Sequence, residues 1–184
     1  MTNRGAYVHD LRHRYSLELR PDAALDARLR AVAVELEAAG LMPTGAAQQP
    51  RFHPHVTVLR GARAVDLVLG VDVGTGAVTF DRAGTFGHGR ILWIAPADDT
   101  SLRLLRDRAA ATLDPTEVDP LVTARAWTPH LTLAYAVPEP SRAAALERVQ
   151  STLPITGRWG SLEAWDLDVR PTVRVARIVV PPVG

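Results

Sequence analysis

Cysteine and lysine are both absent from the 184-residue chain, and each absence removes a class of chemistry. Without cysteine there is no disulfide, no thiolate nucleophile and no cysteine-ligated zinc. Without lysine, neither a P-loop lysine nor a Schiff-base lysine is possible. All 21 residues counted as Lys+Arg are therefore arginine. A GC-rich genome is the simplest explanation, yet arginine still supplies the planar fork that grips phosphate oxygens in pairs.

Long apolar runs and excess charge are also missing. No run of 18 apolar residues occurs, and the N-terminal segment MTNRGAYVHDLRHRY is polar. We therefore expect no transmembrane helix, no secretory signal peptide and a cytoplasmic location. The net charge of 21 − 20 = +1 argues against a long electrostatic track for nucleic acid. A small anionic ligand in a local pocket remains open, because Arg51, Arg60 and Arg63 form a basic cluster without an acid among them.

The remaining composition is that of a globular protein. Apolar residues make up 47% of the chain, enough for a sizeable core, and no linker is obvious. The pattern predicts strands over 13–20, 52–60, 78–86, 90–95 and 124–136, two or three more over 155–180, and helices over 23–39, 64–69, 98–113 and 139–153. The expected fold class is α+β, with residues 1–184 forming one domain and a monomer.

An internal repeat relates residues of about 15–60 to those of about 90–135. A shift of 75 residues without a gap lays one strand–helix–strand unit on another. The aligned pairs include Phe52 with Trp127, Pro54 with Pro129, His55 with His130, and Thr57 with Thr132. Two copies are too few for a solenoid. We therefore expect two pseudo-symmetric lobes of antiparallel sheet plus helices around a central cleft.

Each copy ends in a strand that carries aromatic-x-Pro-His-x-Thr. Side chains alternate along a strand, so the histidine and threonine share one face and the apolar neighbours share the other. Phosphoryl transfer needs one group to take a proton from the nucleophile and another to protonate the leaving oxygen, which two imidazoles can do near neutrality. Threonine hydroxyls can stabilise the non-bridging oxygens. The predicted catalytic residues are His55, Thr57, His130 and Thr132.

The segments Pro54-His55-Val56-Thr57-Val58 and Pro129-His130-Leu131-Thr132-Leu133 resemble the signature of the two-histidine (2H) phosphoesterase superfamily, which includes 2′-5′ RNA ligase-like proteins and cyclic phosphodiesterases. The resemblance covers roughly residues 13–181. It implies a bilobal fold with a central cleft, no metal or other cofactor, and hydrolysis of 2′,3′-cyclic or 2′,5′ phosphodiesters. The implied partner is a small phosphodiester or an RNA end. The resemblance does not choose among these substrates, nor between hydrolysis and ligation.

Further residues are candidates for substrate binding. Arg60 stands at an odd spacing from His55, so it contacts the phosphate only if a bulge or strand end turns it inward. Its repeat partner is Tyr135. Arg125 is a second candidate ligand, five residues before His130. The aromatic residues that could stack on a base, or belong to the core, are Phe86, Trp93 and Trp127.

Two other functions stay open. The cleft could belong to a nucleotide- or RNA-binding module that turns nothing over, although binding alone would not require both imidazoles. The chain could also be a metal-dependent hydrolase, because His53 and His55 share a face at a two-residue spacing. That reading ranks last, since the repeat equivalent of His53 is Thr128 and the sequence shows no obvious carboxylate partner.

Overall fold

The computed structural model describes residues 14–47, 52–62, 76–122, 127–168 and 173–179. The strands are β1 (Tyr15–Pro21), β2 (Val56–Gly61), β3 (Ala77–Phe86), β4 (Ile91–Pro96), β5 (Leu131–Ala134), β6 (Ile155–Asp166) and β7 (Val173–Val179). The α-helices are α1 (Ala23–Ala38), α2 (Thr100–Ala110) and α3 (Arg142–Thr152). Short 3₁₀ turns span Pro115–Glu117, Pro120–Val122 and Glu139–Ser141. The helix predicted over 64–69 lies outside the described residues.

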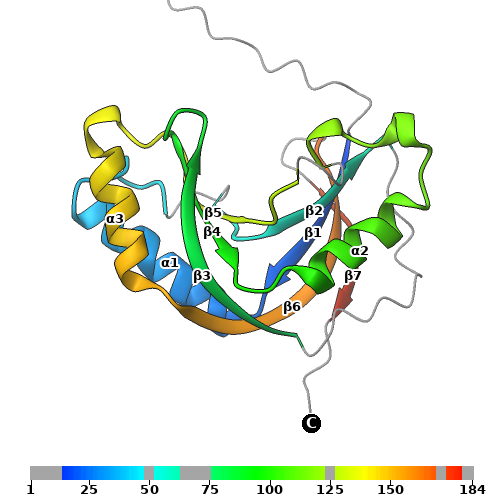
Figure 1. The fold of residues 1–184 in the computed structure, drawn as a ribbon, viewed down its shortest axis with the longest axis horizontal. Helices are drawn as coiled ribbons and strands as arrows, with labels where there is room; N and C mark the ends of the chain where they lie inside the picture. The colour runs from blue at the N-terminus through cyan, green and yellow to red at the C-terminus, as the bar shows by residue number, and fades with distance from the viewer. Residues whose placement is uncertain (1–13, 48–51, 63–75, 123–126, 169–172, 180–184) are drawn as a thin grey trace, which may run out of the picture.

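Within the described residues, seven strands form one antiparallel sheet in the order β1-β2-β5-β4-β3-β6-β7. β6 is long enough to pair twice along its length. Its first residues pair with β3, and the remainder pairs with β1. The sheet is thereby closed into a ring through β6, and it curves as Figure 1 shows. This arrangement confirms the expected α+β class.

The predicted repeat is visible in the centre of the sheet. β1, α1 and β2 correspond to β4, α2 and β5 after the shift of 75 residues. Val56 of β2 pairs with Leu131 of β5, and these two residues are themselves repeat equivalents. An approximate two-fold axis therefore passes between β2 and β5. Each repeat's helix packs on the other repeat's motif strand, α1 on β5 and α2 on β2.

Local sequence explains where the helices begin and what they bury. The Asp22 side chain caps α1 by accepting a 2.8 Å hydrogen bond from the Leu25 backbone N–H. One face of α1 is buried through Leu25, Leu29, Val32, Ala33 and Leu36. Figure 1 shows α1 and α3 together at one side of the curved sheet and α2 at the other. Among the described residues, no helix is both long and apolar enough to span a bilayer.

The motif strands begin later than the sequence pattern predicts. The strand expected over 52–60 starts at Val56, and the one expected over 124–136 is described only from Leu131. Pro54 and Pro129 stand just before these starts and have no N–H to donate to a strand ladder. Each motif histidine is therefore the last residue before its strand.

Candidate active site

The pairing of β2 with β5 brings the two motifs together. Val56 and Leu131 are fully buried, and they face each other in the antiparallel register. Continuing that register by one residue in each direction places His55 opposite Thr132 and Thr57 opposite His130. All four lie on the face opposite the buried pair. The structure thus brings together the four residues predicted to be catalytic.

Both imidazoles are held in the same way by the backbone. The Nδ1 atom of His55 lies 2.8 Å from the carbonyl oxygen of His53, and Nδ1 of His130 lies 2.7 Å from that of Thr128. A carbonyl oxygen only accepts, so Nδ1 donates in each case. The neutral imidazole therefore carries its lone pair on Nε2, the nitrogen available for proton transfer.

The neighbours of the two histidines differ. Nε2 of His55 lies 3.5 Å from a carboxylate oxygen of Glu18. His130 instead packs on Phe86 in a T-shaped arrangement, with ring centroids 4.8 Å apart, and its ring centroid lies 6.3 Å from that of Trp93. Glu18 and Trp93 are repeat equivalents, so one substitution in the repeat gives the histidines unlike surroundings.

Burial disfavours the charged form of both imidazoles. It lowers the pKa of His55 to about 4, and repulsion from Arg20 and His130 acts in the same direction. The hydrogen bond to the His53 carbonyl opposes this shift. Burial also lowers the pKa of His130, again against a backbone hydrogen bond, here to Thr128. The electrostatic effect of His130 on His55 agrees with their placement in one site.

Glu18 is the functional candidate that sequence reasoning missed. It lies on β1 opposite Thr57, with 3% of its surface exposed, and one of its oxygens lies 3.7 Å from Nε2 of His53. Burial raises the pKa of its carboxyl group, while His53 and Arg20 pull it down. The premise that no carboxylate accompanies His53 and His55 was therefore wrong. The only signal in the sequence was a glutamate between two core leucines of a predicted strand.

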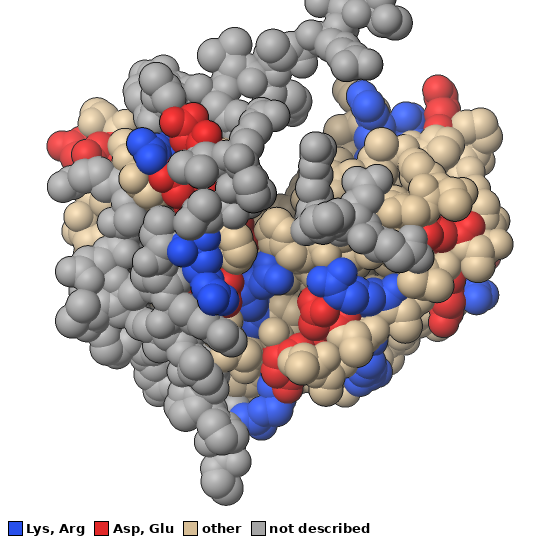
Figure 2. Space-filling model, turned by 180° about the vertical axis from the view of Figure 1, so that it is seen from behind, with Lys and Arg blue, Asp and Glu red and all other residues tan. Residues whose placement is uncertain are grey.

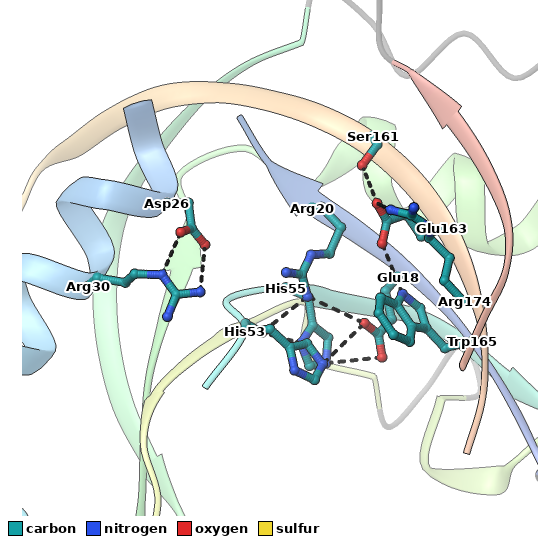
Figure 3. A network of polar contacts seen from close by, with 10 residues as sticks. All are labelled: Glu18, Arg20, Asp26, Arg30, His53, His55, Ser161, Glu163, Trp165 and Arg174. Atoms are coloured by element: carbon teal, nitrogen blue, oxygen red, sulfur yellow. Dashed lines mark hydrogen bonds and ion pairs between the residues drawn. The ribbon is translucent and has the colours of Figure 1, made fainter. Parts of the chain in front are cut away.

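A cluster of stacked rings and polar contacts surrounds Glu18 (Figure 3). The His53 ring stacks on His55 at a centroid distance of 4.9 Å and on Trp165 at 5.7 Å. The Trp165 indole donates to Glu163 at 3.1 Å. Glu163 also accepts from Ser161 at 2.9 Å and Arg174 at 3.3 Å. These contacts hold the His53 ring in one orientation.

A β-bulge follows the threonine in each motif strand. Val58 in β2 and Leu133 in β5 are each an extra residue relative to the neighbouring strand, and they are repeat equivalents. A bulge reverses the alternation of faces beyond it. Arg60 therefore lies on the same face as the motif threonines, as a substrate contact would require, whereas Tyr135 lies just beyond the end of β5. Arg60 also forms a 3.5 Å ion pair with Asp119, and Tyr135 is exposed.

Trp127 is a core residue, which corrects its predicted role in stacking on a substrate. Only 5% of its surface is exposed, and its indole donates to the Thr57 carbonyl at 3.1 Å. Arg106 covers its ring at 4.9 Å. The aromatic at this position supports the opposite motif strand and is closed to a base. Phe86 and Trp93, both half-buried beside His130, remain accessible candidates. Arg125 lies outside the described residues.

Comparisons with known proteins agree with this geometry. A family model for the 2′-5′ RNA ligase superfamily matches residues 73–170. A solved structure of Escherichia coli LigT with 3′-AMP aligns at a TM-score of 0.50 and 16% identity, covering 91% of this chain and 98% of that one. Another, with NADP⁺, aligns at a TM-score of 0.54 and 15% identity, covering 91% and 97%. No curated protein matches by sequence. The structural likeness shows the shared fold, and because the family model covers more than half of the sequence, the chain belongs to the 2′-5′ RNA ligase superfamily.

Proposed function

We infer that this protein hydrolyses 2′,3′-cyclic or 2′,5′ phosphodiester bonds of nucleotides or RNA ends, using two histidines as general base and general acid. The observation that carries this inference is the pairing of Val56 with Leu131. It places two imidazoles with the same backbone-fixed tautomer on one face of the sheet. A binding site would need neither the second imidazole nor the matched orientation of both Nε2 atoms.

The unlike surroundings of the two histidines support a division of the two roles. Burial and the nearby charges of Arg20 and His130 keep His55 neutral, which suits the base. Among the described residues, no arginine adds to the effect of burial on the pKa of His130, which favours His130 as the acid. In hydrolysis of a cyclic phosphate, His55 removes a proton from water as its oxygen bonds to phosphorus. His130 donates a proton to the departing 2′ or 3′ oxygen.

The hydroxyls and the arginine complete the reaction. Thr57 and Thr132 donate hydrogen bonds to the two non-bridging oxygens, whose negative charge grows in the transition state. Arg60, turned to this face by the bulge, adds a positive charge at the edge of the site. Phe86 and Trp93 offer an aromatic surface for a base next to His130. No step requires a metal.

A small ligand suits the surface better than a long nucleic acid. On the face seen in Figure 2, the arginines of the described residues are interspersed with acidic side chains. The described residues on this face therefore form no continuous basic track for a phosphate backbone. The solved LigT structures with 3′-AMP and NADP⁺ show that relatives in fold bind nucleotide-sized ligands.

The test is a panel of 2′,3′-cyclic nucleotides and 2′,5′-dinucleotides, assayed with and without EDTA. Activity should survive chelation. His55→Ala and His130→Ala should each lower kcat by about 10²–10⁴, and the double variant should lose little more, because both act on one transition state. His88→Asn serves as the control, since His88 lies in an exposed turn at positive φ that asparagine tolerates.

Two results would contradict the proposal. One is a double variant that keeps the wild-type rate, which would show that the two histidines have no catalytic role. The other is tight nucleotide binding by the wild type with no turnover of any substrate in the panel. The second result would favour the non-catalytic binding module.

A further inference from the structure

Glu18, His53 and His55 place three metal-ligand atoms around one point. One carboxylate oxygen of Glu18 lies 3.5 Å from Nε2 of His55, and the other lies 3.7 Å from Nε2 of His53. Taken together, one ligand atom from each residue lies within 4.8 Å of the other two. A tetrahedral zinc ion with ligand bonds of about 2 Å separates its ligand atoms by little more than 3 Å. Small side-chain shifts would therefore close this arrangement around an ion.

The ligand atoms are already oriented. The Nδ1–H of His55 donates to a backbone carbonyl at 2.8 Å, which leaves Nε2 free to ligate. Metal-binding histidines are commonly fixed by this kind of second hydrogen bond. The ring of His53 stacks on the rings of both His55 and Trp165, and Figure 3 shows the three side chains together. Only modest conformational freedom would be lost when a metal binds.

The carboxylate of Glu18 provides an independent indication of a ligand. It is 3% exposed, yet its Oε2 atom makes no hydrogen bond. A buried oxygen without a hydrogen bond is costly, and the long ion pairs with Arg20 and His53 compensate it only in part. Arg20 lies 3.9 Å from the same oxygen, too far for a hydrogen bond. Its charge opposes a cation, so we expect a Zn²⁺ dissociation constant on the order of micromolar, weaker than that of structural zinc sites.

We propose that Glu18, His53 and His55 bind a transition-metal dication of the Zn²⁺ class and that the bound ion inhibits the enzyme. Two imidazoles and one carboxylate form a ligand set that suits zinc and leaves a fourth position for water or a phosphate oxygen. An ion on Nε2 of His55 occupies the lone pair that would otherwise accept a proton. Metal binding stands independently of the proposed function, whereas inhibition depends on it.

Calorimetric titration of untagged full-length protein with ZnCl₂ tests the binding. Wild type should bind one ion per chain, and MgCl₂, which prefers oxygen ligands, should show no binding. Glu18→Gln and His53→Asn should each weaken zinc binding by at least about 10-fold. His88→Asn, which removes an exposed histidine elsewhere, should bind as wild type does. Absence of zinc binding, or equal binding by all four proteins, would overturn the site.

The inhibition is tested with a 2′,3′-cyclic nucleotide that the wild type hydrolyses. Zinc should inhibit the wild type, and EDTA should restore its rate. His53→Asn, compared with its own rate in the absence of zinc, should lose most of the zinc inhibition, because the ion then lacks one of its three ligands. Activation by zinc, or equal inhibition of both proteins, would overturn the inhibitory role. Zinc binding by a protein inactive on the whole panel would contradict the proposed function and leave the metal site standing.

Discussion

At two positions the repeats carry unlike residues, and these differences give the two sides of the site different chemistry. Where one repeat has Glu18 the other has Trp93, and where one has Arg60 the other has Tyr135. One side of the site is therefore polar and charged, while the other is aromatic. The motifs supply the same two functional groups twice, and their neighbours make those groups different.

The pH dependence of the reaction follows from the two histidine pKa shifts. The base must be neutral, so kcat/KM should fall as pH drops toward about 4, where His55 becomes protonated. The acid must be charged, so the rate should fall as pH rises through the lowered pKa of His130. The resulting bell should have its optimum below the ordinary histidine pKa of about 6.5. A pH–rate profile from pH 3.5 to 9 measures it.

The control for this profile is His55→Ala, whose residual activity should lose the acid limb and keep the alkaline one. Because His55 and His130 interact, the two apparent pKa values of the profile belong to the pair of histidines. The variant is needed to assign each limb to one histidine. An acid limb centred above pH 6.5 in the wild type would contradict the assignment of His55 as the base.

Glu18→Gln should stabilise the protein increasingly as pH rises. Burial raises the pKa of Glu18 in the folded state, so the folded protein holds its proton at pH values where the unfolded chain has lost it. The stability that protonated Glu18 contributes is fully present at pH values below the pKa of Glu18 in the unfolded chain. It is lost as the pH rises through the pKa of Glu18 in the folded protein. Because glutamine does not titrate, the Glu18→Gln variant does not suffer this loss of stability. The difference in Tm between variant and wild type, measured from pH 5 to 8, should grow; a constant or negative difference would contradict the prediction.

Residues identified by a motif could be predicted from the sequence, whereas residues identified by strand pairing could not. His55 and His130 are recognisable because the 75-residue repeat preserves them. Glu18 faces Thr57 only through the register of β1 and β2, which no local pattern specifies. For Trp127 the sequence left two roles open, because an aromatic before a motif fits either a ligand surface or a core, and its burial decides for the core.

At the scale of the strands, the bulges control what reaches the site. Pleat alternation alone would turn Arg60 away from the histidines. The extra residues Val58 and Leu133 reverse that direction at the same place in both repeats. The sequence allowed a bulge here but could not require one, because Val58 and Leu133 are as apolar as any regular strand residue. The positions of the described helices and of the other strands, by contrast, followed closely from hydrophobic periodicity, whereas the two motif strands begin later than predicted.

A glycine in β3 lets an aromatic ring lie against the strand beside His130. A Cβ added at Gly84 would meet the Trp93 ring at 2.3 Å. Gly84→Ala should therefore displace Trp93 and lower kcat/KM, with a stability loss of about 1–3 kcal/mol from overpacking. Steady-state kinetics and chemical denaturation measure the two effects.

Gly160→Ala is the matched control for that variant. Its added Cβ would meet backbone atoms near Asp22 at 2.9 Å, in β6 and away from His130. It should lose stability and keep its kcat/KM when assayed well below its Tm. Equal kinetic losses in the two alanine variants would show that general destabilisation, and not the position of Trp93, controls the rate.

At the scale of the whole molecule, the two repeats are interlocked. Each helix packs on the motif strand of the other repeat. β6 pairs with β1, which belongs to the first repeat, and also with β3. β3 in turn pairs with β4, which belongs to the second repeat. Neither repeat buries its own apolar faces without the other. The protein should therefore behave as one folding unit.

Scanning calorimetry tests this cooperativity. We expect one transition whose calorimetric and van't Hoff enthalpies agree. A chain divided between residues 62 and 76 into two separately expressed pieces should give no cooperative transition in either piece alone. Two resolved transitions in the intact protein, or a cooperatively folding fragment, would show that the repeats are independent.

The approximate two-fold axis between Val56 and Leu131 has a counterpart in the proposed substrate. In the proposed in-line transition state, an approximate two-fold axis through phosphorus exchanges the attacking and leaving oxygens of the phosphoryl group and also its two non-bridging oxygens. A site with that symmetry offers one imidazole and one hydroxyl to each half of the group. The motifs alone then accept the diester in either of two orientations. The choice between them, and hence which ester bond is cut, falls to the carboxylate on one side and the indole on the other.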